Sequence, residues 1–163
     1  MRLSLGILFI LILSITSTQN VLAQNPRDIH IDFKINAEAI FNGGDVESNS
    51  SMSDDNNGKS PNGKPSKFES EAYASKFVNW EIFDTGNNSR NYQIKMLDFP
   101  WTGNVDAFSK NPLQGGGKKA KAKIKDNTPD GTLKYTIRFE IRNKRTRETK
   151  TFELDPRLKI RRR

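Results

Sequence analysis

Hydrophobic and polar residues alternate one by one over much of this chain, and a period of two predicts β-strands rather than helices. Residues 29–35 place three isoleucines and one phenylalanine at every second position, which is typical of a half-buried strand. Residues 133–142 repeat the pattern with larger apolar side chains on one phase and mostly charged ones on the other. The same signal predicts further strands at residues 77–83, 91–99, 119–125, 149–154 and 158–160.

Turn signals separate these segments and indicate the fold class. Residues 126–131 (DNTPDG) combine turn-forming Asn, Asp, Pro and Gly, and residues 143–148 (NKRTRE) are typical of a charged hairpin tip. Residues 37–41 either extend the first strand or form one helical turn. Seven or eight short strands, without a convincing amphipathic helix, predict an all-β domain built as an antiparallel sandwich or barrel.

Residues 42–67 interrupt the alternation with a composition that leaves almost nothing to bury. Asn, Ser, Gly, Asp, Lys and Pro dominate this stretch, as in mobile connections. A loop of this length inside a compact domain is uncommon and is either functional or disordered. We therefore expect residues 42–67 to be a disordered insertion between an N-terminal strand and the main body.

The first 23 residues have the organisation of a cleaved secretory signal. Arg2 precedes a nearly continuous apolar run over residues 3–15, and residues 21–23 (VLA) provide a small-residue exit. The run is shorter than the ~20 residues of a membrane span. We expect a signal helix that is cleaved near Ala23, which leaves one domain, residues 24–163, in the periplasm or outside the cell without a transmembrane anchor.

The composition narrows the possible chemistry. The 163 residues include no cysteine and one histidine, which argues against lipid attachment, thiol catalysis and thiolate metal sites. Neither a hydrolase nucleophile elbow nor a phosphate-binding P-loop is present. We therefore predict a non-catalytic protein without a cofactor. The net charge of +8 favours anionic partners, although solubility alone is a simpler explanation.

Three short segments resemble small exported bacterial domains that have a cupredoxin-like, Ig-like β-sandwich. They are a tryptophan strand at residues 78–80 (VNW), residues 133–137 (LKYTI), and residues 154–160 (LDPRLKI), which are similar to a closing LDPxIxI strand. The resemblance covers residues 78–160 and implies a Greek-key sandwich in which the last two segments pair. It implies no activity, since the copper ligands of true cupredoxins have no match here.

A row of lysines is the first candidate interaction surface. Lysines alternate with small or apolar residues over 119–125, so their side chains are expected on one strand face. If the strand at 132–142 is the neighbour, its basic residues would extend this face into a plate that binds polyanions. The alternative is a solvated face whose charge protects an edge strand. The candidate residues are Lys119, Lys121, Lys123, Lys125, Lys134, Arg138 and Arg142.

Three further segments carry residue types that are common in binding sites. Phe99 and Trp101 lie in a turn, where they either dock a sugar or protein or close the end of the core. His30 shares its strand face with Asp28 and Asp32, but residues two apart are ~6.6–7 Å apart along a strand, which is wide for one ion. Residues 54–60 superficially resemble a calcium loop that lacks its final glutamate. We predict no metal site.

The sequence thus predicts an exported structural or binding module with no enzymatic activity. The alternative is an adhesion module that binds polyanions or glycans through residues 119–125. Possible partners are an anionic polysaccharide or another envelope component. Nucleic acid is a poor candidate for an exported protein, and no aromatic residues interleave with the lysines.

Overall fold

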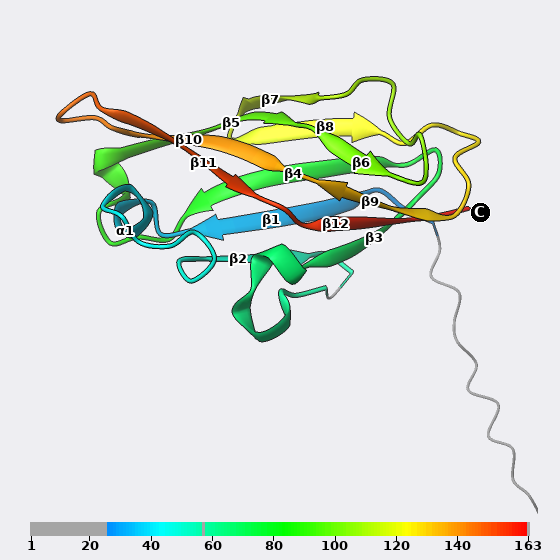
Figure 1. Ribbon diagram of the computed structural model, residues 1–163, viewed down its shortest axis with the longest axis horizontal. Helices are drawn as coiled ribbons and strands as arrows, with labels where there is room; N and C mark the ends of the chain where they lie inside the picture. Colours follow the sequence, from blue (N-terminus) through cyan, green and yellow to red (C-terminus); the bar gives the residue numbers. More distant parts are fainter. Residues whose placement is uncertain (1–25, 57, 163) are drawn as a thin grey trace, which may run out of the picture.

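The computed structural model describes residues 26–56 and 58–162, and the predicted signal segment lies outside them. The fold is all-β: a curled eight-stranded sheet and a second sheet of four strands enclose one core (Figure 1). The strand order is β11-β10-β5-β7-β8-β4-β1-β2 in the first sheet and β3-β12-β9-β6 in the second. The strands are β1 (Ile29–Ile35), β2 (Ser50–Asp54), β3 (Glu69–Tyr73), β4 (Phe77–Asp84), β5 (Tyr92–Phe99), β6 (Trp101–Gly103), β7 (Leu113–Gly117), β8 (Lys119–Lys123), β9 (Gly131–Tyr135), β10 (Ile137–Asn143), β11 (Thr149–Leu154) and β12 (Arg157–Arg161).

Short helical turns connect some of these strands. One α-helical turn, α1 (Ala37–Phe41), follows β1, which decides between the two alternatives left open by the sequence. Asn36 caps this turn, since its side-chain oxygen accepts a hydrogen bond from the backbone N–H of Ala39 at 3.1 Å. Ile40 and Phe41 are buried and close one end of the core. The 3₁₀ turns are η1 (Pro61–Gly63), η2 (Pro65–Lys67) and η3 (Ser89–Asn91).

The two sheets are joined by three neighbouring strands that run from one sheet into the other. β5 continues into β6 after Pro100, β9 into β10 after Thr136, and β11 into β12 after residues 155–156. Proline cannot donate to a ladder, which makes it suitable at such breaks. Hydrogen bonds still link the strands at the bend, where Thr136 donates its N–H to Pro100 at 2.9 Å and Tyr135 donates to Pro156 at 3.2 Å.

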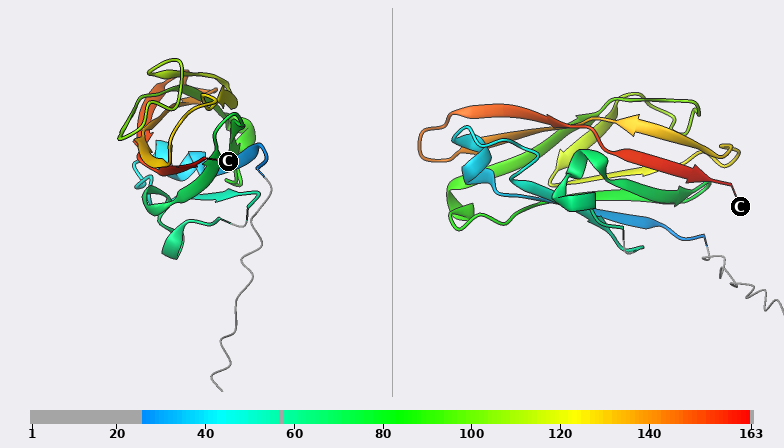
Figure 2. Two further views of the ribbon diagram at one scale, coloured as in Figure 1. Left: turned by 90° about the vertical axis from the view of Figure 1, so that its right-hand side faces the viewer. Right: turned by 60° about the horizontal axis from the view of Figure 1, so that its bottom comes forward.

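The alternation in the sequence corresponds to the inside and outside of this structure. All four apolar residues of β1 are at most 1% exposed, and the apolar residues of β9 and β10 are at most 4% exposed. Viewed along the long axis, the strands surround the core (Figure 2). β9 pairs antiparallel with β12, as the resemblance to exported sandwich domains implied. The prediction of an all-β fold is confirmed.

The predicted antiparallel arrangement is wrong for two of the ladders, which are parallel. β1 pairs in parallel with β4, and β3 pairs in parallel with β12. Parallel neighbours need a crossover of about a dozen residues or more. The segment between β1 and β4 supplies one, since it contains α1, β2 and β3. A period of two does not record strand direction, so the sequence pattern could not reveal this pairing.

The predicted disordered insertion, residues 42–67, contains ordered structure in the described residues. β2 pairs antiparallel with β1 and buries Met52, which is 2% exposed. Polar contacts replace apolar burial in the rest of the segment. The Ser66 hydroxyl donates to the Glu47 carboxylate at 2.7 Å, and the backbone N–H of Ser48 donates to Asp45 at 2.9 Å. The prediction of a disordered connection is therefore wrong for the β2 region.

Asp155 at the β11–β12 bend makes the stability of this fold dependent on pH. The Thr136 hydroxyl donates to its carboxylate at 2.7 Å and Lys134 pairs with it at 3.1 Å, and together these contacts hold the pKa of Asp155 below its ordinary value. A lowered pKa stabilises the fold above the ordinary aspartate pKa of about 3.9, and the contribution is lost as the pH falls through the lowered value.

We therefore expect Asp155→Asn to lower stability at neutral pH and to reduce the loss of stability between neutral pH and about pH 3. Urea unfolding at a series of pH values measures both effects. If the variant and the parent lose equal stability on acidification, Asp155 does not contribute to the pH dependence.

Candidate functional site

The predicted lysine row exists, but its members are engaged with other side chains. Lys119, Lys121 and Lys123 are exposed on the outer face of β8. Lys119 Nζ lies 3.1 Å from the carboxylate of Glu81 on β4. Lys121 Nζ lies 4.1 Å from the centroid of the Phe77 ring, which is a cation–π contact. The neighbouring strand β4 therefore satisfies two of these three lysines.

The remaining lysines of the row are paired with carboxylates from loops. Lys123 Nζ lies 2.8 Å from Asp126, and Lys125, which follows β8, pairs with Asp106. These pairs are exposed and contribute little to stability. They do reduce the positive potential of the row, because a negative charge lies beside most of its ammonium groups. A uniformly basic plate over residues 119–125 is therefore not what the structure presents.

The proposed extension of this plate to other basic residues is wrong. β8 lies between β4 and β7, and two strands separate it from β10, so Arg138 and Arg142 do not adjoin the lysines. Arg138 Nε instead lies 2.8 Å from Asp98 and 3.9 Å from Glu153, on the strands that flank β10. The sequence located the basic phase of each strand but could not give the strand order.

Lys134 is also separate from the row, because β9 belongs to the four-stranded sheet. Its Nζ pairs with Asp155 at the bend between β11 and β12. This lysine therefore supports the joint between the sheets.

An open concavity with a volume of about 300 Å³ lies on the outer face of β1, β4 and β8. The strand register arranges polar side chains around it in two rows. His30 lies opposite Asn79, which lies opposite Lys121. In the second row Asp32 lies opposite Glu81, which lies opposite Lys119. The six polar side chains lining the concavity are His30, Asp32, Asn79, Glu81, Lys119 and Lys121.

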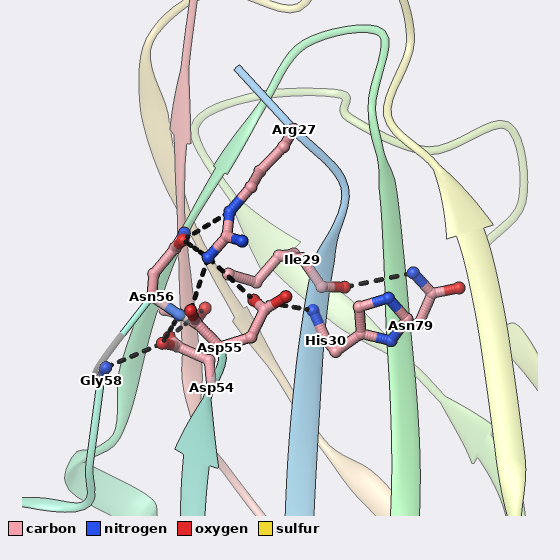
Figure 3. A network of polar contacts seen from close by, with 9 residues as sticks. Arg27, Ile29, His30, Asp54, Asp55, Asn56, Gly58 and Asn79 are labelled. Atoms are coloured by element: carbon pink, nitrogen blue, oxygen red, sulfur yellow. Dashed lines mark hydrogen bonds and ion pairs between the residues drawn. The ribbon is translucent and has the colours of Figure 1, made fainter. Parts of the chain in front are cut away.

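Backbone contacts hold this face in place and leave two side chains free. The Asn79 amide donates to the carbonyl of Ile29 at 3.2 Å, next to His30 (Figure 3). The backbone N–H of His30 donates to the Asp55 carboxylate at 3.2 Å. The side chains of His30 and Asp32 make no hydrogen bond or ion pair with the residues that the structure describes. Imidazole and carboxylate groups are therefore available to a ligand.

The calcium-like segment is a closed loop in which Asp54 binds backbone and hydroxyl groups. One carboxylate oxygen accepts the N–H of Asn56 at 2.9 Å and that of Gly58 at 2.8 Å (Figure 3). The other oxygen accepts the hydroxyl of Ser70 at 2.7 Å, which connects β2 to β3. Arg27 donates to the side-chain oxygen of Asn56 at 3.1 Å. Asp54 thus organises the loop and already accepts three hydrogen bonds from the protein.

Asp28 differs from His30 and Asp32 in that its side chain is hydrogen-bonded within the protein. Its carboxylate accepts the backbone N–H of Phe77 at 3.0 Å, at the start of β4. Within residues 26–56 and 58–162, the structure holds no group of three or more His, Cys, Asp or Glu side chains arranged to bind a metal ion.

The two aromatic residues of the predicted docking turn have different environments. Phe99 is fully buried and its ring lies 5.1 Å from that of Trp80, so it belongs to the core and cannot dock a partner. Trp101 is half-buried, and its indole N–H donates to the carbonyl of Lys110 at 3.1 Å. The centroids of the Trp101 and Phe108 rings lie 6.2 Å apart. The sequence left two roles open for this turn, docking of a partner or closure of one end of the core. The positions of both rings agree with closure of the core.

Tyr135 is the buried polar aromatic residue of this cluster. Its hydroxyl accepts a hydrogen bond from the Trp80 indole at 3.2 Å. Burial raises the pKa of Tyr135 far above its ordinary value, so the hydroxyl stays neutral. The neutral hydroxyl therefore contributes to the core through its hydrogen bond with Trp80.

Sequence reasoning missed the polar residues that β4 contributes to the concavity. Asn79 and Glu81 occupy the polar phase of a predicted strand, so their outward orientation could be foreseen. Their position between Lys119–Lys123 and β1 could not, because it depends on strand order. The mixture of acids, amide and bases appears only once the three strands are placed side by side.

The fold places this chain in the all-β class, with two sheets around a shared core. Among solved structures, it is similar to the inclusion body protein PixA from Burkholderia cenocepacia J2315, with a TM-score of 0.63. The match covers 85% of this chain and 98% of that chain at 11% sequence identity, which shows a common fold. No protein-family model matches the chain, and no curated protein matches it. No helix in the described part is long and apolar enough to cross a membrane.

Proposed function

We propose that this chain is an exported, non-catalytic Greek-key sandwich module that binds neutral glycans of the cell envelope. The binding site is the concavity on β1, β4 and β8. The observation that carries the proposal is its lining, in which carboxylates, an amide, an imidazole and ammonium groups alternate over one exposed face. Export is supported by the sequence of residues 1–23, and the comparison with PixA supports only the fold.

Mixed hydrogen-bonding groups favour sugar hydroxyls over polyanions. A hydroxyl both donates and accepts, so it can bind Asp32 and Asn79 at the same time. A polyanion would instead meet the carboxylates of Asp32 and Glu81 directly beside the lysines, and like charges at this distance repel. The volume of about 300 Å³ is at the lower end of the range for ligand pockets and suits one or two sugar units.

Binding of short neutral oligosaccharides tests this function. Chitotriose, maltotriose and mannotriose, each titrated by calorimetry, serve as neutral probes, and trigalacturonate serves as the acidic one. We expect at least one neutral probe to bind with little dependence on salt. Asp32→Ala with Asn79→Ala should weaken that binding at least about 30-fold, because a hydrogen bond to a carboxylate is worth about 1.5–3 kcal/mol and one to an amide about 0.5–1.5 kcal/mol.

Lys123→Ala provides the matched control, since Lys123 lies on the same face of β8 outside the concavity and should leave sugar binding unchanged. Asp32→Ala alone should not destabilise the fold, because it removes a carboxylate that faces Glu81. Binding of trigalacturonate alone, with an affinity that falls steeply with salt, would instead identify a polyanion site. In that case the proposed function is wrong.

A further inference from the structure

The β10–β11 hairpin has a tightly organised tip at the end of the molecule opposite the C-terminus (Figure 1). Asn143 builds the tip: its side-chain oxygen accepts the N–H of Arg145 at 2.9 Å and that of Thr146 at 3.2 Å. Its backbone N–H donates to Glu148 at 2.9 Å, and Arg147 donates back to the carbonyl of Asn143 at 2.8 Å. The basic side chains of the tip are therefore presented from a defined backbone.

A second loop is attached to this tip and adds another arginine. The backbone N–H of Lys144 donates to the carbonyl of Asn91 at 2.8 Å. Its side-chain Nζ donates to the carbonyl of Arg90 at 2.9 Å. These two contacts connect the hairpin to the β4–β5 loop, which is more than fifty residues earlier in the sequence. Arg90 is thereby held beside the hairpin.

The resulting basic end consists of five exposed side chains, and none of them forms an ion pair with another residue in the described structure. Glu148, the carboxylate of the hairpin tip, is paired with Lys150 at 3.4 Å. Glu38 on α1 accepts both of its side-chain hydrogen bonds from the neutral Asn88 amide, and in the described structure it forms no ion pair with the basic residues of the tip. This uncompensated charge contrasts with the neutralised row on β8. The five residues of the basic end are Arg90, Arg142, Lys144, Arg145 and Arg147.

The backbone of Arg147 adopts a conformation that is uncommon for a residue with a Cβ atom. Arg147 has φ of +65°, in the left-handed region that favours glycine. A glycine would relieve the unfavourable contact of the Cβ atom with the backbone. An arginine at this position is therefore less favourable for the backbone than a glycine would be.

We propose that this basic end is a docking surface for the phosphate headgroups of an anionic lipid membrane, separate from the sugar-binding concavity. The hairpin projects beyond the rest of the fold, so its tip can approach a flat surface without a clash (Figure 1). Arginine binds phosphate through two parallel hydrogen bonds, and four of the five residues are arginines. The tip sequence NKRTRE has no apolar side chain, so the protein adsorbs to the surface without inserting.

Vesicle co-sedimentation of the purified chain tests this surface. One set of vesicles contains equal parts phosphatidylglycerol and phosphatidylcholine, and the other contains phosphatidylcholine alone. We expect binding to the anionic vesicles only, with an affinity that falls as salt is added. Arg147→Gly should weaken binding about fivefold, which corresponds to about 1 kcal/mol per basic residue near an anionic surface. Because it relieves the backbone at Arg147, the same variant should raise the melting temperature.

Lys110→Gln and Arg157→Gln together form the matched control. Both side chains are exposed, belong to neither the hairpin nor the β4–β5 loop, and make no ion pair with the described residues. Arg145→Gln combined with Arg147→Gly removes the same charge from the basic end and should weaken binding about 25-fold. If the control loses as much, net charge alone governs binding and the proposal is wrong. Binding to heparin without binding to anionic vesicles would also overturn it, in favour of a polysaccharide.

Discussion

Replacing Met52 with alanine should lower the free energy of unfolding by about 2–5 kcal/mol, the usual cost of truncating a buried methionine. Met52 is 2% exposed and lies opposite Phe33 in the ladder between β2 and β1. The truncation leaves a cavity between β2 and the core, because the ladder with β1 at the residues before and after Met52 prevents the strand from collapsing into it. Urea unfolding, followed by the fluorescence of the buried Trp80, measures the loss.

Two matched variants show whether the loss comes from the packing of Met52 or from any substitution in β2. Met52→Leu conserves volume and should cost less than about 1.5 kcal/mol. Ser51→Ala changes the opposite, exposed face of the same strand and should stay within about 0.5 kcal/mol of the parent. A loss below about 0.5 kcal/mol for Met52→Ala would mean that β2 does not pack in solution. Residues 42–67 would then be disordered, as their composition predicts.

The strands that could be predicted from sequence are those that carry their own apolar face. β1 has the same limits as its alternating pattern, and β11 does as well. β4 and β5 differ from their predicted bounds by one residue at one end. In each case the side chains that fill the core are present within the strand itself, so no knowledge of its neighbours is needed.

The strands that were missed depend on their neighbours. β7 (LQGGG) has three glycines and one apolar residue, and nothing in that composition indicates a strand. A Cβ atom at Gly115 would lie 2.3 Å from the carbonyl oxygen of Met96, so the glycine permits the close approach of β7 to β5. Likewise, β2 buries a single methionine and otherwise relies on its ladder with β1.

The same distinction applies to the candidate sites. The lysine row follows from the alternation in β8 alone, and it lies where the sequence placed it. Its carboxylate partner Glu81 and the concavity follow from the register of β4 between β1 and β8, which spans about ninety residues of sequence. The basic end requires Lys144 to reach the carbonyl of Arg90. Local patterns thus identify charged faces, whereas only tertiary contacts show which of those charges remain uncompensated.

Truncation of Phe139 to alanine should be among the most damaging single changes, with a loss of about 3–5 kcal/mol in the free energy of unfolding. Phe139 is fully buried at the centre of β10. Its ring packs edge-on against Phe33 of β1, with centroids 5.3 Å apart, and lies 5.7 Å from Phe152 of β11. It therefore connects opposite ends of the curled sheet, and the contact with Phe33 crosses the core.

Phe152→Ala serves as the comparison, because it removes the same side chain from an edge strand where the ring is only half-buried. Its cost should be about 1–1.5 kcal/mol, in proportion to the smaller area withdrawn from water. Urea unfolding of both variants and of the double variant gives their coupling energy. Equal losses for the two single variants would contradict a core centred on Phe139, and would show instead that the edge strand β11 limits the stability of the fold.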